Sequence, residues 1–461
     1  MIEFPPNSDI LSNKLFLLKI EGVICLDKFD GNSLTNGALN ITPTYIFFTS
    51  NTKKHEIWLP ICFVYSAEKY PATKYGIPLL LKGKDFRVLR LLFKKDDECQ
   101  AVLDTIINLM VTESIGKLRC FQYKPPEITS ERSIGWTFFS LDKQFSQMGI
   151  PNNKWTLSDI NFNYQICESY PQLVCVPNSA SSITLVGSSK FRSKGRLPVL
   201  TYLHPTNHSS LCRSSQPLSG FNNKCTEDIL MLDLIRRNNT SSDHLLHIVD
   251  ARPHINAFTN KVKGKGFEDP TNYPNICLKF FDIDHIHVMR NSYEKLIKCL
   301  QNTSLNPDDL AVSIDKTAWL RHIKMVLNAA YYVADCMEKK VSVLVHCSDG
   351  WDRTSQIVSL AQVILDPFYR TFEGFQALIE KDWILFGHKF IERCGLLTSG
   401  DPKETSPIFM QFLECIHHLI SVFPTKFQFD ETLLLFLHDH VYSSNYGTFV
   451  SFNEMSRLEN E

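Results

Sequence analysis

Long apolar runs are absent from this chain of 461 residues. No apolar stretch reaches the roughly 18 charge-free residues that a membrane-spanning helix needs, so any membrane contact is expected to be peripheral. The 14 cysteines include no C-x-x-C pair, which argues against a zinc ribbon. No charged and apolar leader opens the chain, so the scattered cysteines favour a reducing, cytoplasmic setting.

An excess of charge of either sign is also missing. Lys and Arg number 48 and Asp and Glu number 49, which gives a formal net charge of −1. Such a chain exerts no long-range attraction on nucleic acid, so we expect no nucleic-acid partner, and any membrane binding must come from local patches. Hydrophobic residues make up 44% of the chain, as in ordinary globular proteins, and the length predicts two or three domains.

Short β-rich runs separated by turn residues fill the first part of the chain. Residues 96–110 then carry apolar side chains at helical spacing, with acids in the first turn. This pattern predicts a first domain, residues 1–115, built as a small β-sandwich or barrel closed by one C-terminal helix. A linker containing Pro125 and Pro126 is predicted over residues 116–132. The predicted β runs are Leu15–Leu26, Gly37–Thr49, His55–Tyr65, Ile77–Leu81 and Phe86–Phe93.

Strands alternate with helices in the second predicted domain, residues 133–461. This alternation predicts an α/β domain, a central sheet flanked by helices, with its functional loop at the C-terminal end of a strand. The polar residues Ser456–Glu461 show no pattern. The predicted strands are Ile183–Gly187, His247–Val249, Ile276–Phe281 and Val341–Val345. The predicted helices are Glu227–Arg236, Trp319–Met337, Thr354–Leu365, Phe372–Cys394, Ile408–Val422 and Asp430–Tyr442.

The most informative segment joins the last predicted strand to a helix through a short loop. Residues 341–354 read VSVLVHCSDGWDRT and hold Cys347 and Arg353 six positions apart. Backbone N–H groups and the helix N-terminus would converge on this loop, which favours an anion and the thiolate form of the cysteine. Arg353 offers planar, bidentate donors to phosphoryl oxygens. A buried structural cysteine beside an unrelated arginine is the alternative, but the strand, the glycine and the hydroxyl residue after the arginine together favour a phosphatase with a cysteine nucleophile.

The amino-acid sequence of this loop, HCSDGWDRT from His346 to Thr354, closely resembles the signature of the myotubularin family of 3-phosphoinositide phosphatases. Within that family it is most similar to the subgroup of myotubularin-related proteins six, seven and eight. The first domain is similar to the PH-GRAM module of the same family. Further segments that resemble the family are residues 145–151, 164–177, 190–202, 213–220, 250–268, 286–290, 368–393 and 423–449.

The resemblance implies a function. It predicts removal of the 3-phosphate from phosphatidylinositol 3-phosphate and phosphatidylinositol 3,5-bisphosphate through a phosphocysteine intermediate. We expect no metal or other cofactor, because arginine and backbone dipoles supply the positive charge. The implied partners are phosphoinositide lipids and a homo-oligomer or an inactive myotubularin-related protein. The implied location is cytoplasmic, at the surface of endosomal or other internal membranes.

Several residues acquire predicted roles. The leaving inositol oxygen needs a proton; two loop acids could give it, and the resemblance assigns Asp352 rather than Asp349 as general acid. Lys389 and Arg393, four residues apart on one predicted helix, could bind a second phosphate. In the family, an arginine is usual at position 389 and an asparagine at position 285. The predicted substrate-binding residues are Asn260, His285, Ser348, Asp349, Gly350, Trp351, Lys389 and Arg393, beside the catalytic Cys347, Asp352 and Arg353.

Alternatives remain open at this point. A phosphoprotein phosphatase would use the same nucleophile, and a low-activity or inactive lipid-binding adaptor would keep the same fold. The first domain would either bind lipid or protein, or serve only as a scaffold. Two basic runs on presumed loops are read either as solvated faces or as patches that steer the domain to anionic headgroups. They are Lys190, Arg192, Lys194 and Arg196, and Lys261, Lys263 and Lys265.

Overall fold

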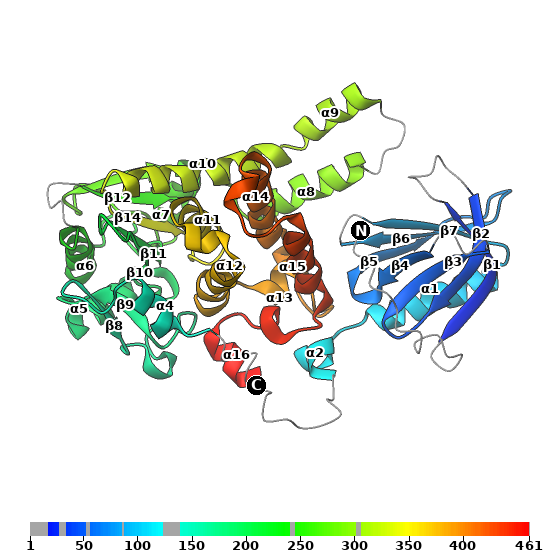
Figure 1. Cartoon of the computed structure of the whole chain (residues 1–461), viewed down its shortest axis with the longest axis horizontal. Coiled ribbons are helices and arrows are strands. Elements are labelled where there is room, and N and C mark those ends of the chain that lie inside the picture. The colour runs from blue at the N-terminus through cyan, green and yellow to red at the C-terminus, as the bar shows by residue number, and fades with distance from the viewer. Residues whose placement is uncertain are drawn as a thin grey trace.

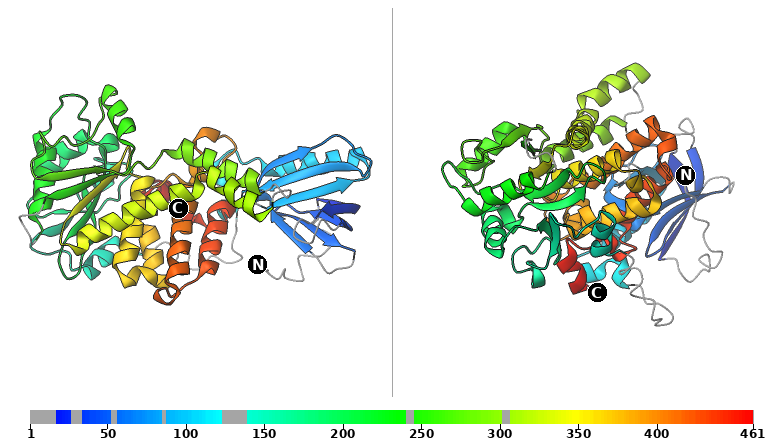
Figure 2. Two further views of the ribbon diagram at one scale, coloured as in Figure 1. Left: turned by 90° about the horizontal axis from the view of Figure 1, so that it is seen from above. Right: turned by 60° about the vertical axis from the view of Figure 1, so that its left-hand side comes forward.

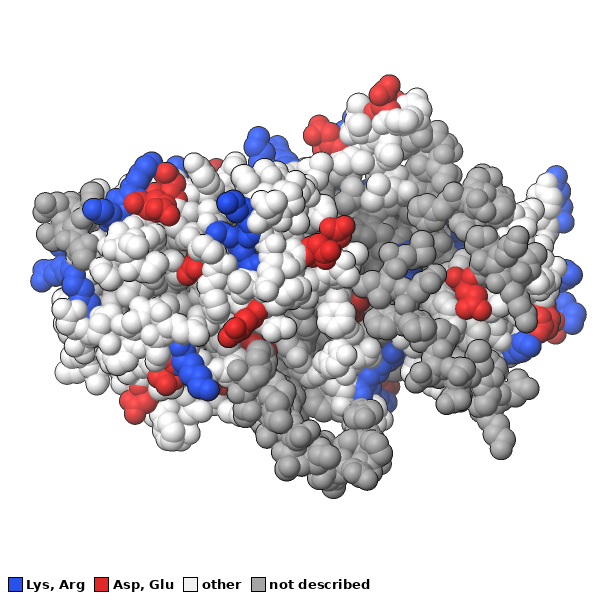
Figure 3. Space-filling view, in the orientation of Figure 1, with Lys and Arg blue, Asp and Glu red and all other residues white. Residues whose placement is uncertain are grey.

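Two seven-stranded sheets organise the chain, one in each half (Figure 1). The computed structural model describes residues 17–26, 34–51, 56–84, 87–122, 139–239, 245–300 and 306–460. The predicted linker with Pro125 and Pro126 lies for the most part outside the described residues. On the face drawn in Figure 3, positive and negative side chains are interspersed, in line with the net charge of −1.

The N-terminal sheet is entirely antiparallel, in the order β4-β3-β2-β1-β7-β6-β5. Side chains alternate along β6, where Ile77, Leu79 and Leu81 point into the core. Helix α1 (Asp96–Met110) closes the domain, as predicted, by burying Cys99, Val102 and Ile106. The strands are β1 (Leu18–Leu26), β2 (Leu34–Ile41), β3 (Tyr45–Ser50), β4 (Glu56–Pro60), β5 (Val64–Lys69), β6 (Ile77–Gly83) and β7 (Val88–Phe93).

The second sheet is mixed, with the order β13-β12-β14-β11-β10-β9-β8. Strands β13, β12, β14 and β11 run parallel, and β10, β9 and β8 continue the sheet antiparallel. The carboxyl ends of the four parallel strands therefore share one edge. The strands are β8 (Trp155–Ser158), β9 (Val174–Pro177), β10 (Val199–Leu203), β11 (Ser210–Ser215), β12 (Leu246–Asp250), β13 (Ile276–Phe280) and β14 (Val343–Cys347).

Alternation along β14 decides which side chain meets which layer of helices. Val343, Val345 and Cys347 pack in the hydrophobic core with α10 (Trp319–Glu338) and α11 (Arg353–Leu365). Leu344 packs on the opposite face with α5 (Ser182–Phe191) and α6 (Thr226–Arg237). Helix α11 is buried on all sides from Arg353 to Val363, because further helices cover it.

Two local predictions in this domain are wrong. Ile183–Gly187 lies in α5 rather than in a strand, because the Ser181 hydroxyl caps the helix by accepting the Thr184 N–H at 3.2 Å. The predicted helix Phe372–Cys394 is three pieces: α12 (Phe372–Ile379), a π-helix (Glu380–Leu385) and α13 (Phe390–Cys394). The C-terminal end is helical in α16 (Glu454–Asn460).

The remaining helices lie around this sheet and next to the N-terminal domain, except that α9 (Pro307–Lys316) projects outward and buries no residue (Figure 1). They are α2 (Arg119–Gln122), α4 (Leu141–Gln147), α7 (His254–Val262), α8 (Ile286–Leu300), α9, α14 (Ile408–Val422) and α15 (Glu431–Ser443). In the described part of the chain, no helix has the length and apolar character needed to cross a membrane.

The two domains lie side by side, with α8 and α15 facing the N-terminal sheet (Figures 1 and 2). The Tyr293 hydroxyl of α8 donates to the Lys84 carbonyl at 3.0 Å, and the Lys84 ammonium donates to the Gly395 carbonyl at 3.3 Å. The Thr398 N–H donates to the Thr112 carbonyl at 2.8 Å. One continuous hydrophobic cluster includes residues of both domains, so the N-terminal domain is docked on the C-terminal one.

Candidate active site

The loop between β14 and α11 has the form that its sequence predicts. Cys347 is the last residue of β14 and Arg353 the first of α11. The Gly350 N–H donates to the Cys347 sulfur at 3.3 Å. The Arg353 guanidinium donates to the Ser348 hydroxyl at 3.4 Å and to the Ile283 carbonyl at 2.9 Å. Sulfur, backbone N–H groups and the positive end of a helix of 13 residues thus meet at one place, where a phosphate would be stabilised.

Gly350 gives the loop its shape. Its φ of +82° lies in the left-handed region, and a Cβ atom there would lie 2.5 Å from the Ser214 carbonyl oxygen of β11. Its own carbonyl accepts hydrogen bonds from two buried guanidinium groups, those of Arg196 and Arg213, each at 3.0 Å. Two buried guanidinium groups therefore fix the carbonyl of the residue whose N–H donates to the sulfur.

A second contact ties the loop to the neighbouring strands. The Gln216 N–H, just after β11, donates to the Ser348 carbonyl at 3.2 Å. The Gln216 side-chain oxygen accepts from the Arg252 guanidinium and, at 3.1 Å, from the Asn260 amide. Arg252 is itself fixed by a bidentate pair with Asp250, with an Nη2 to Oδ2 distance of 2.6 Å. Asn260 of α7 is thereby placed at the edge of the site.

Asp352, immediately before the loop arginine, is held as an anion. Arg393 of α13 donates to both carboxylate oxygens, at 3.1 and 2.9 Å, and the His388 ring nitrogen lies 3.2 Å from one of them. Burial acts to raise the pKa of Asp352, but the positive charge of Arg393 and the bonds from both partners outweigh it and hold that pKa well below its usual range. His388 also bonds the Trp351 carbonyl at 2.8 Å, so one ring nitrogen spans two loop residues.

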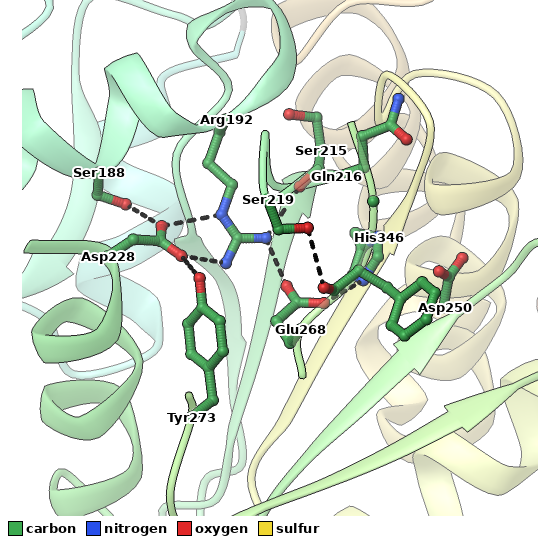
Figure 4. Close-up of polar contacts among 12 residues, drawn as sticks. Ser188, Arg192, Ser215, Gln216, Ser219, Asp228, Asp250, Glu268, Tyr273 and His346 are labelled. Atoms are coloured by element: carbon green, nitrogen blue, oxygen red, sulfur yellow. Dashed lines mark hydrogen bonds and ion pairs between the residues drawn. The ribbon is translucent and has the colours of Figure 1, made fainter. Parts of the chain in front are cut away.

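An ion-pair network lies beneath the loop, on the face of the sheet opposite α11 (Figure 4). The His346 ring contacts the Cys347 carbonyl at 3.2 Å on one side and the Glu268 carboxylate at 3.0 Å on the other. Glu268 accepts from Arg192 at 2.6 Å, and Arg192 makes a bidentate pair with Asp228. Burial acts to raise the pKa of Glu268, yet His346 and Arg192 hold it well below its usual range. A buried network of ion pairs therefore supports the backbone at Cys347.

Comparison with known proteins agrees with this geometry. Residues 118–458 match the description "Myotubularin-like phosphatase domain". The chain belongs to the myotubularin-like phosphatase family. Residues 19–110 match "MTMR6-9, GRAM domain", so a GRAM domain precedes the phosphatase domain, as predicted.

The relatives carry phosphoinositide phosphatase names. The chain is 44% identical over 435 residues to "Phosphatidylinositol-3,5-bisphosphate 3-phosphatase MTMR8" of Gallus gallus, covering 94% of this chain and 69% of that protein. It is 43% identical over 444 residues to "Phosphatidylinositol-3-phosphate phosphatase MTMR7" of Homo sapiens (96% and 67%). It is 44% identical over 443 residues to "Phosphatidylinositol-3,5-bisphosphate 3-phosphatase MTMR6" of Homo sapiens (96% and 71%). The predicted subgroup is therefore confirmed.

The structure places Lys389 and Arg393 differently from the sequence prediction. They do not share one long helix, because the chain leaves helical geometry after the π-helix and Lys389 only precedes α13. Arg393 is 4% exposed and is engaged by Asp352 and, at 2.8 Å, by Glu404. Lys389 is half-buried, 5.3 Å from the centre of the Trp351 ring. In this myotubularin-like domain, Arg393 thus positions an acid, and Lys389 remains beside the loop.

The other predicted residues lie in the loop or beside it. Trp351 is half-buried and makes an edge contact with Phe452 at 5.4 Å. The Asp349 carboxylate accepts from the Ser193 hydroxyl at 3.1 Å, and its side chain is half-buried. His285 is exposed, and its pKa is lowered by partial burial and by the nearby charges of His287 and Arg353. These surroundings therefore favour the neutral form of the His285 imidazole.

Sequence reasoning missed the residues that support the loop. Arg192 and Arg196, taken for part of an exposed basic run, are buried ion-pair and hydrogen-bond donors, and only Lys190 and Lys194 of that run are exposed. No role was predicted from the sequence for Arg213, Gln216 or His388. A signal existed for Arg213, since it is the one charge in the β-rich run Ser-Leu-Cys-Arg-Ser-Ser, and a charge inside a buried strand must have a partner.

Proposed function

We propose that this chain removes the 3-phosphate from phosphatidylinositol 3-phosphate and phosphatidylinositol 3,5-bisphosphate, with Cys347 as nucleophile. The observation that carries the proposal is the loop itself, in which the Cys347 sulfur accepts the Gly350 N–H while Arg353 and the N-terminus of α11 face the same place. The names of the relatives at 43–44% identity support the choice of lipid.

The reaction proceeds in two displacements. The Cys347 thiolate attacks the 3-phosphoryl group, a sulfur–phosphorus bond forms, and the bond from phosphorus to the inositol oxygen breaks. A water molecule then attacks the phosphocysteine, the sulfur–phosphorus bond breaks, and inorganic phosphate leaves with the thiolate restored. Arg353 and the loop N–H groups stabilise the charge on the equatorial phosphoryl oxygens in both steps.

Asp352 remains our candidate for the acid that protonates the leaving oxygen. Its ion pair with Arg393 keeps it as a carboxylate in the free protein, so it must gain a proton when the substrate is bound. A substrate phosphate that draws the Arg393 guanidinium away would raise the pKa of Asp352 and prepare it for that role. Asp349, held only by the Ser193 hydroxyl at 3.1 Å, is the alternative acid.

The inositol ring would lie between the loop and the side chains around it. Lys389 would meet a second phosphate, Trp351 would contact the ring, and Asn260 and His285 would bind hydroxyls at the edge of the site. The GRAM domain supports peripheral association with endosomal or other internal membranes, on the cytoplasmic side. A homo-oligomer or an inactive myotubularin-related protein completes the proposed set of partners.

Phosphate release from a panel of phosphoinositides, beside a phosphotyrosine peptide, tests the proposal. The wild-type chain should act on the 3-monophosphate and 3,5-bisphosphate and not on the peptide. The Cys347→Ser variant should lose turnover while it keeps its fold and its lipid binding, since a hydroxyl is not ionised at neutral pH. Preference for the peptide would support a phosphoprotein phosphatase, and lipid binding without turnover by the wild-type chain would support an adaptor.

A further inference from the structure

Helix α7 presents an apolar stripe to the solvent. Ile255, Phe258 and Val262 are 72%, 50% and 72% exposed. Their spacing of three and four residues puts them on one face of the helix, while Ala257 on another face is fully buried. A helix of a globular domain normally turns its apolar stripe to the core. Single exposed apolar residues are common on proteins, but three on one helix of nine residues indicate a binding surface.

The same helix borders the phosphate loop. It begins four residues after β12 ends, at the edge of the sheet where β14 ends with Cys347. On its inner side the Asn260 amide donates to Gln216, whose N–H donates to the Ser348 carbonyl of the loop. The apolar stripe is therefore the outer face of an element whose inner face touches the active site.

A second loop extends this surface and adds positive charge. The Gly220 N–H donates to the Lys265 carbonyl at 3.1 Å, so the segment after β11 lies against the segment after α7. The next residue, Phe221, is 64% exposed. Lys224 and Lys263 are exposed in these two segments. In the second segment Glu268 is buried, and the Asp269 carboxylate accepts the Thr271 N–H at 3.0 Å. Apolar side chains with cations beside them fit the headgroup and acyl boundary of an anionic bilayer.

We infer that Ile255, Phe258, Val262 and Phe221 insert into an anionic bilayer and hold the loop of Cys347 at the lipid surface. This docking surface rests on the proposed function, because only a lipid substrate requires the catalytic loop to meet a membrane. It is separate from the GRAM domain, so the catalytic domain contributes its own membrane contact. Lys224 and Lys263 attract the domain to the surface before the apolar side chains enter.

Vesicle binding by matched double variants tests the inference. Phe258→Ser with Val262→Ser removes two of the three residues of the stripe. Phe423→Ser with Val422→Ser removes the same residue types, 54% and 66% exposed, at the C-terminal end of α14. In co-sedimentation with phosphatidylcholine and phosphatidylserine vesicles, the α7 variant should bind about 10- to 100-fold more weakly and the α14 variant like wild type. Lys224→Ser should weaken binding about fivefold at low salt and less at high salt.

Kinetics separate this inference from the proposed function. With a soluble short-chain phosphatidylinositol 3-phosphate, the α7 variant should retain wild-type kcat/KM, which also shows that it is folded. With substrate embedded in vesicles, its kcat/KM should fall by at least the factor by which vesicle binding falls. No turnover of either substrate by the wild-type chain would refute the proposed function while leaving vesicle binding measurable. Equal losses for the α7 and α14 variants, or loss of self-association without any change in vesicle binding, would overturn the docking surface.

An added fluorophore gives a second measurement. In an Ile255→Trp variant, vesicles should shift the emission of the new tryptophan to the blue, and brominated lipids should quench it, relative to the six tryptophans of the wild-type chain. Emission that stays unchanged in the presence of bound vesicles would show that α7 does not enter the bilayer.

Discussion

Replacing Arg393 with methionine removes the cation that holds Asp352 as an anion and keeps most of the apolar stem. The two groups form a bidentate pair with contacts of 3.1 and 2.9 Å, and the arginine is 4% exposed. At an effective dielectric constant of about 20, unit charges about 4 Å apart attract by about 4 kcal/mol. This agrees with the cost of about 3–5 kcal/mol for removing one partner of a buried pair. Arg393→Met should therefore lower the free energy of unfolding by about 4 kcal/mol at pH 7.

The loss should depend on pH with a definite sign. In the wild-type protein the pKa of Asp352 is depressed, so its stabilising contribution is present above the unfolded-state value of about 3.9 and is lost as the pH falls below it. Without Arg393, His388 is left to oppose the effect of burial, so the pKa of Asp352 in the folded variant rises. Ionising Asp352 then costs more in the folded state than in the unfolded state, and the variant loses stability as the pH rises above about 4. The gap between variant and wild type should thus widen as the pH rises through the acidic range, and it should level off above the raised pKa of Asp352 in the variant.

Urea unfolding at several pH values measures this gap, and a double-mutant cycle with Asp352→Asn isolates the pair. Arg393→Met should cost much less in the Asp352→Asn background, because no buried charge then lacks a partner. Arg393 also bonds Glu404, a partly exposed partner whose loss should cost little. A cost that is the same at all pH values, or the same in both backgrounds, would refute the electrostatic account and leave only lost packing.

Two further substitutions address the loop itself. Asp352→Asn should slow lipid hydrolysis about 100-fold or more. It should have little effect on an aryl phosphate with a good leaving group, because that leaving group needs no proton. If Asp349→Asn instead slows only lipid hydrolysis, the assignment of the acid is reversed. Gly350→Ala should reduce kcat/KM on both substrates by about 100-fold, because a Cβ placed 2.5 Å from the Ser214 carbonyl must displace the loop. Steady-state kinetics measure this loss. Wild-type activity of Gly350→Ala would show that the loop accommodates the added Cβ without loss of function.

The local sequence determined the position of the loop cysteine and its setting. A run of β-branched and apolar residues ends at Cys347, a glycine permits the turn, and the next helix begins at Arg353, so the geometry of the loop follows from neighbours within a few residues. The same holds for α10, whose apolar face has the helical period in the sequence. Short runs carried less information, since Ile183–Gly187 fits a strand or a helix equally well until the Ser181 cap decides.

Only the tertiary structure decided what supports the loop and what state its acid is in. Arg192 and Arg196 read as surface charges next to Lys190 and Lys194, yet both are buried, because Asp228, Glu268 and carbonyls of distant segments reach them. These partners are 36 to 190 residues away in the chain, so a local sequence pattern cannot predict these contacts.

The charge state of Asp352 could not be predicted from the local sequence either. Position 352 follows from the sequence, but its charge state depends on Arg393, 41 residues further on, which a break in the predicted helix turns towards it. The sequence alone had assigned Arg393 to a substrate phosphate. Residue identity fixes which group can titrate, whereas burial and the distance to the nearest opposite charge fix its pKa, and both of those are properties of the folded chain.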